Sequence, residues 1–183
     1  MSIMLIYLYG ISILEVSSNK KINKKGGNFM KTGFYAGSFD PFTEGHLHVV
    51  KTAAELFEKV IIGIGVHPKK TRRYDKDDMK IAIEKVLERE NLSNVIVIYY
   101  DNLTSDVANE YNSSFLIRGL RNGMDYDYEE NISAINEEVS GLDTIYIRAG
   151  QFGFVSSSMV MELQRVGKDV SKYIPKEVLD ILV

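Results

Sequence analysis

The fold class of this chain can be predicted from one stretch, Gly37-Ser38-Phe39-Asp40-Pro41-Phe42-Thr43-Glu44-Gly45-His46. It links an apolar, strand-like run to a segment in which apolar residues follow helical spacing. Gly37 lets a ligand approach the backbone closely, and Thr43 is a candidate N-cap that places His46 in the first helical turn. Free N–H groups and the helix dipole favour phosphate there, and an imidazole can donate a hydrogen bond to it. The stretch therefore predicts a phosphate site; the alternative is a strand–turn–helix junction with an incidental histidine.

Strand-like and helical segments alternate along the rest of the chain. Continuous apolar, β-branched or aromatic runs predict strands at residues 33–36, 60–66, 95–100, 115–118 and 144–147. Helical spacing of apolar residues predicts helices near 47–57, 79–87, 124–139 and 156–165. This alternation is typical of a parallel sheet with right-handed crossovers. We therefore expect an α/β fold: a single doubly wound, Rossmann-like domain with a mainly parallel five-stranded sheet, binding its ligand at the carboxyl ends of the strands.

The bulk composition narrows the functional classes. A length of 183 residues suits one domain with a substantial core. The net charge of −3 provides no general positive field, so we expect neither nucleic acid nor a membrane as a partner. Cysteine is absent, which excludes disulfides, thiolate metal sites and cysteine nucleophiles and fits a cytoplasmic protein.

The first 29 residues differ in character from the rest. An apolar run over residues 3–16 is too short to span a bilayer, and the lysines follow it instead of preceding it as in a secretory signal. We expect an extension at 1–29 that is either poorly ordered or lies ahead of the true start, and one folded domain at 30–183. In the second case Lys25-Gly26-Gly27-Asn28-Phe29 would be the translation of a purine-rich ribosome-binding sequence before Met30.

A second basic motif, Ile117-Arg118-Gly119-Leu120-Arg121, comes at the end of the fourth predicted strand. Guanidinium groups bind phosphate bidentately and stay charged. Each arginine alone would more often be a solvated surface residue. Their close spacing after a buried strand predicts a phosphate clamp at the ligand edge of the sheet.

These motifs together resemble a known family. The stretch 37–46 resembles the nucleotidyltransferase signature, a small residue pair followed by Phe-Asp and a Thr/His-x-Gly-His box. The arginine motif, followed by Asp125-Tyr126-Asp127-Tyr128-Glu129, resembles bacterial phosphopantetheine adenylyltransferase, in which Arg-Gly-Leu-Arg precedes an Asp-aromatic-x-Tyr-Glu helix start. His67-Pro68-Lys69-Lys70 and Phe152-Gly153-Phe154-Val155-Ser156-Ser157-Ser158 are similar to two further family elements. The resemblance covers about residues 31–182.

The resemblance implies transfer of AMP from ATP to 4′-phosphopantetheine, giving dephospho-coenzyme A and pyrophosphate. Transfer would proceed by direct in-line displacement, with no covalent enzyme intermediate. Mg²⁺ is expected on the triphosphate, without a dedicated protein cage. The family also implies a homo-oligomer, a hexamer.

The same resemblance assigns roles by position. His46 is the expected catalytic residue, contacting the transition-state oxygens. The expected ATP-binding residues are Ser38, Phe39, His46, Gly119, Leu120, Arg121, Glu129, Phe152, Gly153, Phe154, Val155, Ser156, Ser157 and Ser158. The expected acceptor-binding residues are Ser38, Lys70, Thr104 and Arg118.

Two loops depart from the family pattern. Lys70-Thr71-Arg72-Arg73-Tyr74 replaces a Lys-Lys-Pro-aromatic run, and residues 102–107 replace a stretch that shapes the pantetheine pocket. Two alternative functions stay open at this point. One is adenylyl transfer to another phosphate acceptor such as nicotinamide mononucleotide, whose enzymes share a Gly-Ser-Phe-Asp-Pro start. The other is a catalytically silent nucleotide-binding homologue.

Overall fold

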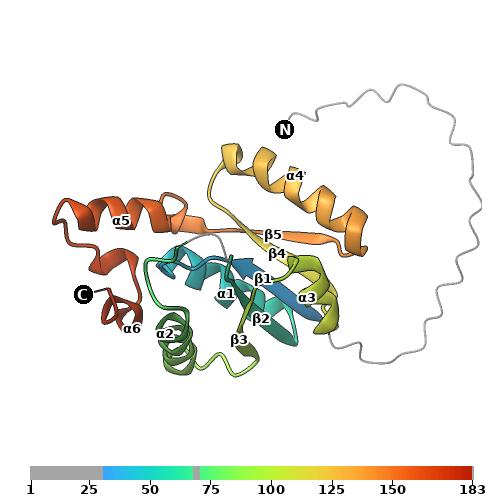
Figure 1. The fold of residues 1–183 in the computed structure, drawn as a ribbon, viewed down its shortest axis with the longest axis horizontal. Helices are drawn as coiled ribbons and strands as arrows, with labels where there is room; N and C mark the ends of the chain where they lie inside the picture. Colours follow the sequence, from blue (N-terminus) through green and yellow to red (C-terminus); the bar gives the residue numbers. More distant parts are fainter. Residues whose placement is uncertain (1–30, 68–70, 183) are drawn as a thin grey trace, which may run out of the picture.

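The computed structural model describes residues 31–67 and 71–182, so the predicted extension at 1–29 and Lys70 lie outside the described residues. Five strands form one sheet in the order β3-β2-β1-β4-β5, and every neighbouring pair is parallel (Figure 1). The strands are β1 (Thr32–Gly37), β2 (Lys59–Gly65), β3 (Val95–Tyr100), β4 (Phe115–Leu120) and β5 (Thr144–Arg148). The predicted α/β class and the five-stranded parallel sheet are confirmed.

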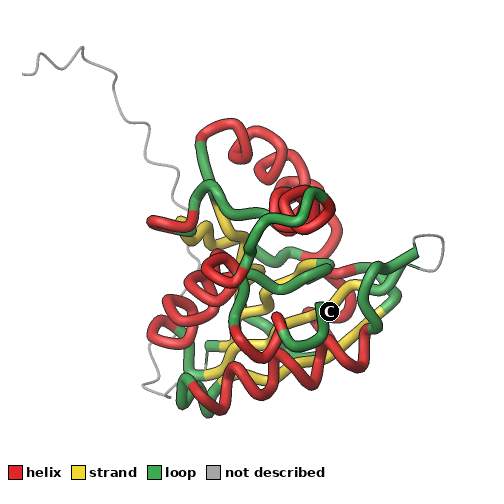
Figure 2. The backbone as a smooth tube through the Cα atoms, turned by 90° about the vertical axis from the view of Figure 1, so that its left-hand side faces the viewer, coloured by secondary structure: helices red, strands yellow, loops and turns green. Residues whose placement is uncertain are grey.

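Helices cover both faces of this sheet, as the view in Figure 2 shows. The helices are α1 (Glu44–Leu56), α2 (Lys76–Arg89), α3 (Thr104–Glu110), α4 (Gly123–Ser140), α5 (Ser157–Arg165) and α6 (Lys176–Leu179), with short 3₁₀ turns η1 (Gly150–Phe152) and η2 (Ser171–Tyr173). The four predicted helices are present. The helices α3 and α6 were not predicted, because α3 is a mostly polar heptapeptide and α6 has only four residues. Among the described residues no helix is long and apolar enough to cross a membrane.

The alternation of side chains along each strand divides the core in two. Tyr35 of β1 belongs to the larger cluster, which contains Val50 of α1 and Ile83 of α2 and extends to α5 and α6. Its neighbour Phe34 belongs to the smaller cluster on the opposite face, with Val107 of α3. The inner strands β1, β2 and β4 contribute to both clusters and are therefore buried on both sides, which is why their sequences read as apolar runs. The edge strands β3 and β5 are partly exposed.

The connections reverse direction beside β1. From β1 the chain winds outward through β2 to β3, then returns to place β4 on the other side of β1 and β5 beyond it. The switch point thus lies between the carboxyl ends of β1 and β4, where ligands bind in open α/β sheets. The loop after β1 contains Ser38 to Thr43, and the end of β4 contains Arg118 to Leu120. The two motifs singled out from the sequence therefore meet at this point.

Candidate active site

A cavity of about 300 Å³ opens at the switch point, between the ends of β1 and β4 and the start of α5. Its walls bring together most of the residues predicted from both motifs. The predicted residues that line it are Ser38, Phe39, His46, Arg118, Gly119, Arg121, Glu129, Val155, Ser156, Ser157 and Ser158. The cavity is predominantly polar and carries two guanidinium groups, so it suits a phosphorylated ligand.

His46 is fixed by a capping box at the start of α1. The backbone N–H of Thr43 donates to His46 Nδ1 at 3.0 Å, and the backbone N–H of His46 donates to Thr43 Oγ1 at 3.4 Å. Thr43 is thus the N-cap predicted from the sequence. A backbone N–H can only donate, so Nδ1 must be an acceptor and the proton of the neutral ring must lie on Nε2. His46 therefore presents an N–H donor on the side of the ring away from Thr43.

The surroundings of His46 keep the ring neutral. Burial, and then the positive charge of Arg121, lower the pKa of His46 from 6.5 to about 4. The ring lies against Phe39, with 5.1 Å between centroids, and against Phe42, at 5.6 Å. Both phenylalanines are fully buried. At neutral pH the residue can therefore donate a hydrogen bond without contributing a full charge.

Both arginines of the second motif are held by carboxylates from α4. Arg118 forms an ion pair with Glu129, and Arg121 Nε and Nη2 lie 2.7 and 2.9 Å from the carboxylate oxygens of Asp125. The two guanidinium groups are thereby oriented at the cavity and remain partly exposed, with 21% and 43% of their side-chain surface accessible. Glu129 was predicted as an ATP ligand; in the structure its carboxylate pairs with Arg118.

A second cavity, of about 500 Å³, adjoins the first along the ends of β1 and β2. The two cavities share Ser38 and Arg118 as wall residues, together with backbone at 36–37. Thr104, predicted to bind the acceptor, lines the second cavity, and its Oγ1 lies 2.7 Å from the hydroxyl of Tyr100. The arrangement offers two adjoining ligand sites that meet at Ser38 and Arg118.

The serine segment at the start of α5 is partly used for structure. Ser156 is the N-cap of α5 and accepts a hydrogen bond from Met159 N at 3.1 Å. Ser157 Oγ donates to the carbonyl oxygen of Pro41 at 2.8 Å, which joins α5 to the loop after β1. Ser158 is exposed at the cavity wall. The first helical turn therefore presents N–H groups, and the hydroxyl of Ser158, to an anionic ligand.

Comparisons with known proteins agree with this geometry. Residues 34–163 match the sequence model of the family described as cytidylyltransferase-like. The phosphopantetheine adenylyltransferase of Rhizobium meliloti (strain 1021) is 37% identical over 151 residues, covering 80% of this chain and 93% of that protein. The enzyme of the same name from Streptococcus pneumoniae (strain Taiwan19F-14) is 38% identical over 153 residues, covering 82% and 93%. The chain belongs to the phosphopantetheine adenylyltransferase family.

Solved structures of more distant proteins share the fold. The nicotinic acid mononucleotide adenylyltransferase of Plasmodium falciparum superposes with a TM-score of 0.61 at 15% identity, covering 83% of this chain and 94% of that one. A bifunctional NMN adenylyltransferase/ADP ribose pyrophosphatase from Francisella tularensis gives 0.59 at 16% identity, covering 84% and 52%. At these identities the likeness shows the fold alone.

Four residues that the family resemblance assigns to ATP lie outside the walls of the first cavity: Leu120, Phe152, Gly153 and Phe154. The ring of Phe152 packs near His48, and Phe154 is 66% exposed with its ring against Tyr173. A Cβ at Gly153 would stand 2.7 Å from the carbonyl oxygen of Arg121, so this glycine permits close packing of η1 on the loop after β4. The direct contact of these four residues with ATP stays a prediction.

The residues at the cavities that the sequence did not assign to a site include Tyr35 and Arg72. Tyr35 lines the first cavity from within β1, and a Cβ at Gly119 would stand 3.2 Å from its hydroxyl oxygen. Burial raises the pKa of Tyr35, so the phenol stays protonated as a donor. Nothing in its sequence context distinguishes it from a core aromatic residue. Arg72 lines the second cavity; the sequence marks it only as part of a run that departs from the family pattern.

Proposed function

We propose that this chain transfers the adenylyl group of ATP to 4′-phosphopantetheine, forming dephospho-coenzyme A and pyrophosphate. The observation that carries the proposal is the pair of adjoining cavities that share Ser38 and Arg118, in a chain whose relatives bear the name of this activity. ATP would occupy the first cavity and 4′-phosphopantetheine the second. Their phosphates would then meet at the shared wall.

The reaction needs positioning and charge stabilisation, without a protein nucleophile. An oxygen of the acceptor phosphate attacks the α-phosphorus of ATP and forms a new P–O bond. The bond from the α-phosphorus to the oxygen that bridges it to the β-phosphorus breaks, and pyrophosphate leaves with that electron pair. Negative charge develops on the oxygens around the α-phosphorus, which is where hydrogen-bond donors lower the barrier.

His46 supplies such a donor in this proposal. Its Nδ1 accepts from Thr43, so the proton on Nε2 is available to a non-bridging oxygen of the α-phosphate. The low pKa of the ring means that this donor is neutral throughout the physiological pH range. A neutral donor held by the capping box needs no reorganisation as the charge develops.

The basic residues divide between the two substrates. Arg118, at the shared wall, would hold the acceptor phosphate, with Glu129 keeping its guanidinium in place. Arg121 would face the triphosphate, and Ser158 and the first turn of α5 would receive its terminal phosphates. Lys70 would assist at the acceptor phosphate; it lies outside the described residues.

Magnesium would enter with ATP as part of the substrate. Within the described ranges no cluster of three or more His, Asp or Glu side chains is arranged to hold a metal ion. Mg²⁺ prefers phosphate oxygens and water to a full protein cage. We propose that it binds the triphosphate and that the protein contacts the complex through its arginines and helix N–H groups. Titration of activity with MgCl₂ at fixed ATP tests this: activity should track the concentration of Mg-ATP.

We also propose a cytoplasmic homo-oligomer, with α4 at the contact between copies. Met124, Tyr128, Ile135 and Val139 are 58–88% exposed and lie on one side of this helix. An apolar stripe of this kind commonly marks a protein–protein interface. Light scattering should give a mass several times that of one chain, and Ile135→Glu should lower this mass. A monomeric mass for the unaltered chain would refute the proposal. Cell fractionation tests the location.

Pyrophosphate release tests the function. Mg-ATP should release pyrophosphate with 4′-phosphopantetheine and not with nicotinamide mononucleotide. Release only with the mononucleotide would assign the chain to the alternative acceptor. Measurable ATP binding without release in either mixture would identify a catalytically silent homologue.

A further inference from the structure

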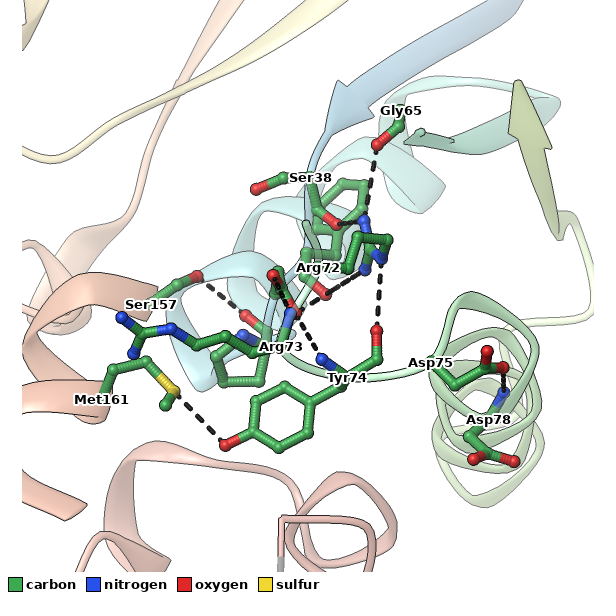
Figure 3. A network of polar contacts seen from close by, with 12 residues as sticks. Ser38, Gly65, Arg72, Arg73, Tyr74, Asp75, Asp78, Ser157 and Met161 are labelled. Carbon is green, nitrogen blue, oxygen red and sulfur yellow. Dashed lines mark hydrogen bonds and ion pairs between the residues drawn. The ribbon is translucent and has the colours of Figure 1, made fainter. Parts of the chain in front are cut away.

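A single arginine at the wall of the second cavity joins three stretches of backbone. Figure 3 shows its contacts. Arg72 Nη1 donates to the carbonyl oxygen of Ser38 at 2.8 Å and to that of Gly65 at 3.4 Å. Its Nη2 donates to the carbonyl oxygen of Phe39 at 3.4 Å, and its Nε to that of Tyr74 at 3.3 Å. The side chain therefore joins the loop after β1, the end of β2 and its own segment.

Asp40 closes this arrangement from the other side. Its carboxylate accepts from the backbone N–H of Arg73 at 3.0 Å and of Tyr74 at 3.1 Å, and lies 3.9 Å from Arg72 Nη2. The side chains of Arg72 and Asp40 are only 14% and 18% exposed. We call this pair with its backbone partners the Arg72 clamp. It also extends to α5, because Tyr74 Oη donates to Gln164 Oε1 at 3.0 Å.

The clamp uses most of the donor capacity of the guanidinium. Arginine has five N–H groups, and Arg72 donates four hydrogen bonds to carbonyl oxygens. The carboxylate of Asp40 lies 3.9 Å from Nη2, as an ion pair. The positive charge of Arg72 is offset by Asp40. Arg72 lines the second cavity, yet its donors point to backbone, so a role in binding a substrate phosphate does not fit its contacts.

We infer that Arg72 is a positioning residue for adenylyl transfer. Ser38 is a wall residue of both cavities and its carbonyl receives the shortest bond of the clamp. Gly65 and Thr71 belong to the wall of the second cavity alone. By joining these stretches, Arg72 fixes the loop that holds the adenylyl donor relative to the wall that holds the acceptor. The inference rests on the proposed function. Arg72 belongs to the run at 70–74, where this chain departs from the pattern of its family.

Loss of Arg72 would change the distance between the two substrates. In-line displacement requires the attacking oxygen and the α-phosphorus at close range, and a misplacement of about 1 Å costs about 10²-fold in rate. Removing Arg72 would leave four carbonyl oxygens without their donor and free the two stretches to move apart. The substrates could still bind, because Arg118, Arg121 and the start of α5 remain. The effect should therefore fall on the rate of transfer.

The test is the steady-state kinetics of Arg72→Ala, measured well below the thermal midpoint of each variant. We expect kcat to fall about 10²-fold, with the KM of each substrate changed much less. Arg72→Lys should recover little of the loss, because one ammonium group cannot reach the separated carbonyl oxygens. Asp40→Asn should also lower kcat. The double variant should lose no more than the worse single one, because the two residues form one unit.

Arg89→Ala is the matched control. Arg89 Nε donates to Glu177 at 2.8 Å and thereby joins α2 to α6, and the residue lines neither of the two cavities. This variant should lower the thermal midpoint and leave kcat unchanged. Hydrogen exchange gives a readout independent of activity: amides in the peptides containing 38–40 and 65–67 should exchange faster in Arg72→Ala and not in Arg89→Ala.

The outcomes separate the clamp from the proposed function. Activity of the unaltered chain with 4′-phosphopantetheine tests the proposed function. The ratio of the kcat of Arg72→Ala to the kcat of the unaltered chain, measured with whichever acceptor the chain uses, tests the clamp. Unchanged kcat with a lowered thermal midpoint would reduce Arg72 to a structural role. A raised acceptor KM at unchanged kcat would make it a phosphate ligand. Full activity of Arg72→Lys, or unchanged exchange at 38–40, would also overturn the inference.

Discussion

Replacing His46 with alanine should remove the neutral donor at the α-phosphate and lower kcat by about 10²–10³-fold, the usual loss for one preorganised donor. The imidazole also completes the capping box of α1, because its Nδ1 accepts from Thr43 N. Its loss should therefore destabilise the fold by about 1 kcal/mol. Assays well below the thermal midpoint, with saturating Mg-ATP and acceptor, separate the two effects. Thr43→Ser, which keeps the cap, should retain near-normal kcat.

The pH dependence of this effect is the sharper part of the prediction. With a pKa of about 4, His46 stays about nine-tenths neutral at pH 5, whereas a pKa of 6.5 would leave about one-thirtieth neutral. Substrate phosphates titrate near pH 6 as well, so the profile of the unaltered enzyme alone is ambiguous. The ratio of its kcat to that of His46→Ala cancels the substrate contribution. That ratio should stay constant from pH 8 to about pH 5 and change near pH 4, where protonation of Nδ1 breaks the bond from Thr43 N that holds the ring in position. A change centred near pH 6.5 would refute the neutral state assigned to His46 at neutral pH.

Three other perturbations test separate parts of the structure. Arg118→Ala should raise the acceptor KM about 10- to 100-fold, because a charged hydrogen bond is lost and Glu129 is left unpaired in the cavity; an unchanged KM would exclude the predicted acceptor clamp. Gly153→Ala should lower the free energy of unfolding by about 1–3 kcal/mol, since its Cβ would stand 2.7 Å from a carbonyl oxygen. Gly123→Ala is the control in thermal melts, because a Cβ there would have no neighbouring atom within 4 Å. Because the lowered pKa of His46 favours its neutral form in the folded state, its contribution to stability is complete above pH 6.5 and is lost as the pH falls toward 4. The thermal midpoint of the unaltered chain should therefore fall more steeply over this range than that of His46→Gln, and parallel curves would contradict this.

The sequence predicted the elements that depend on local pattern. The inner strands β1, β2 and β4 are buried on both faces, so their apolar runs were continuous. The cap formed by Thr43 was readable because capping depends on residues three positions apart. The helix α3 was missed because its stability comes from burying Val107 and Ala108 against the sheet, and its sequence has no helical period of apolar residues.

Contacts between distant segments could not be predicted in the same way. Arg72 and Ser38 are 34 residues apart, and only the fold brings the guanidinium to that carbonyl oxygen. The same holds for Gly153, whose closest neighbour is the backbone of Arg121. The pairing of Arg118 with Glu129 was also not predicted, although Glu129 lines the first cavity as expected of an ATP-site residue; its contact with ATP stays a prediction.

A competition experiment shows which acceptor the chain adenylylates. The chain is incubated with Mg-ATP and equal concentrations of 4′-phosphopantetheine and nicotinamide mononucleotide, and the products are identified by mass spectrometry. We expect dephospho-coenzyme A to accumulate with an equal amount of pyrophosphate and without the dinucleotide that the other acceptor would give. Formation of that dinucleotide alone, or no adenylylated product at all, would contradict the account.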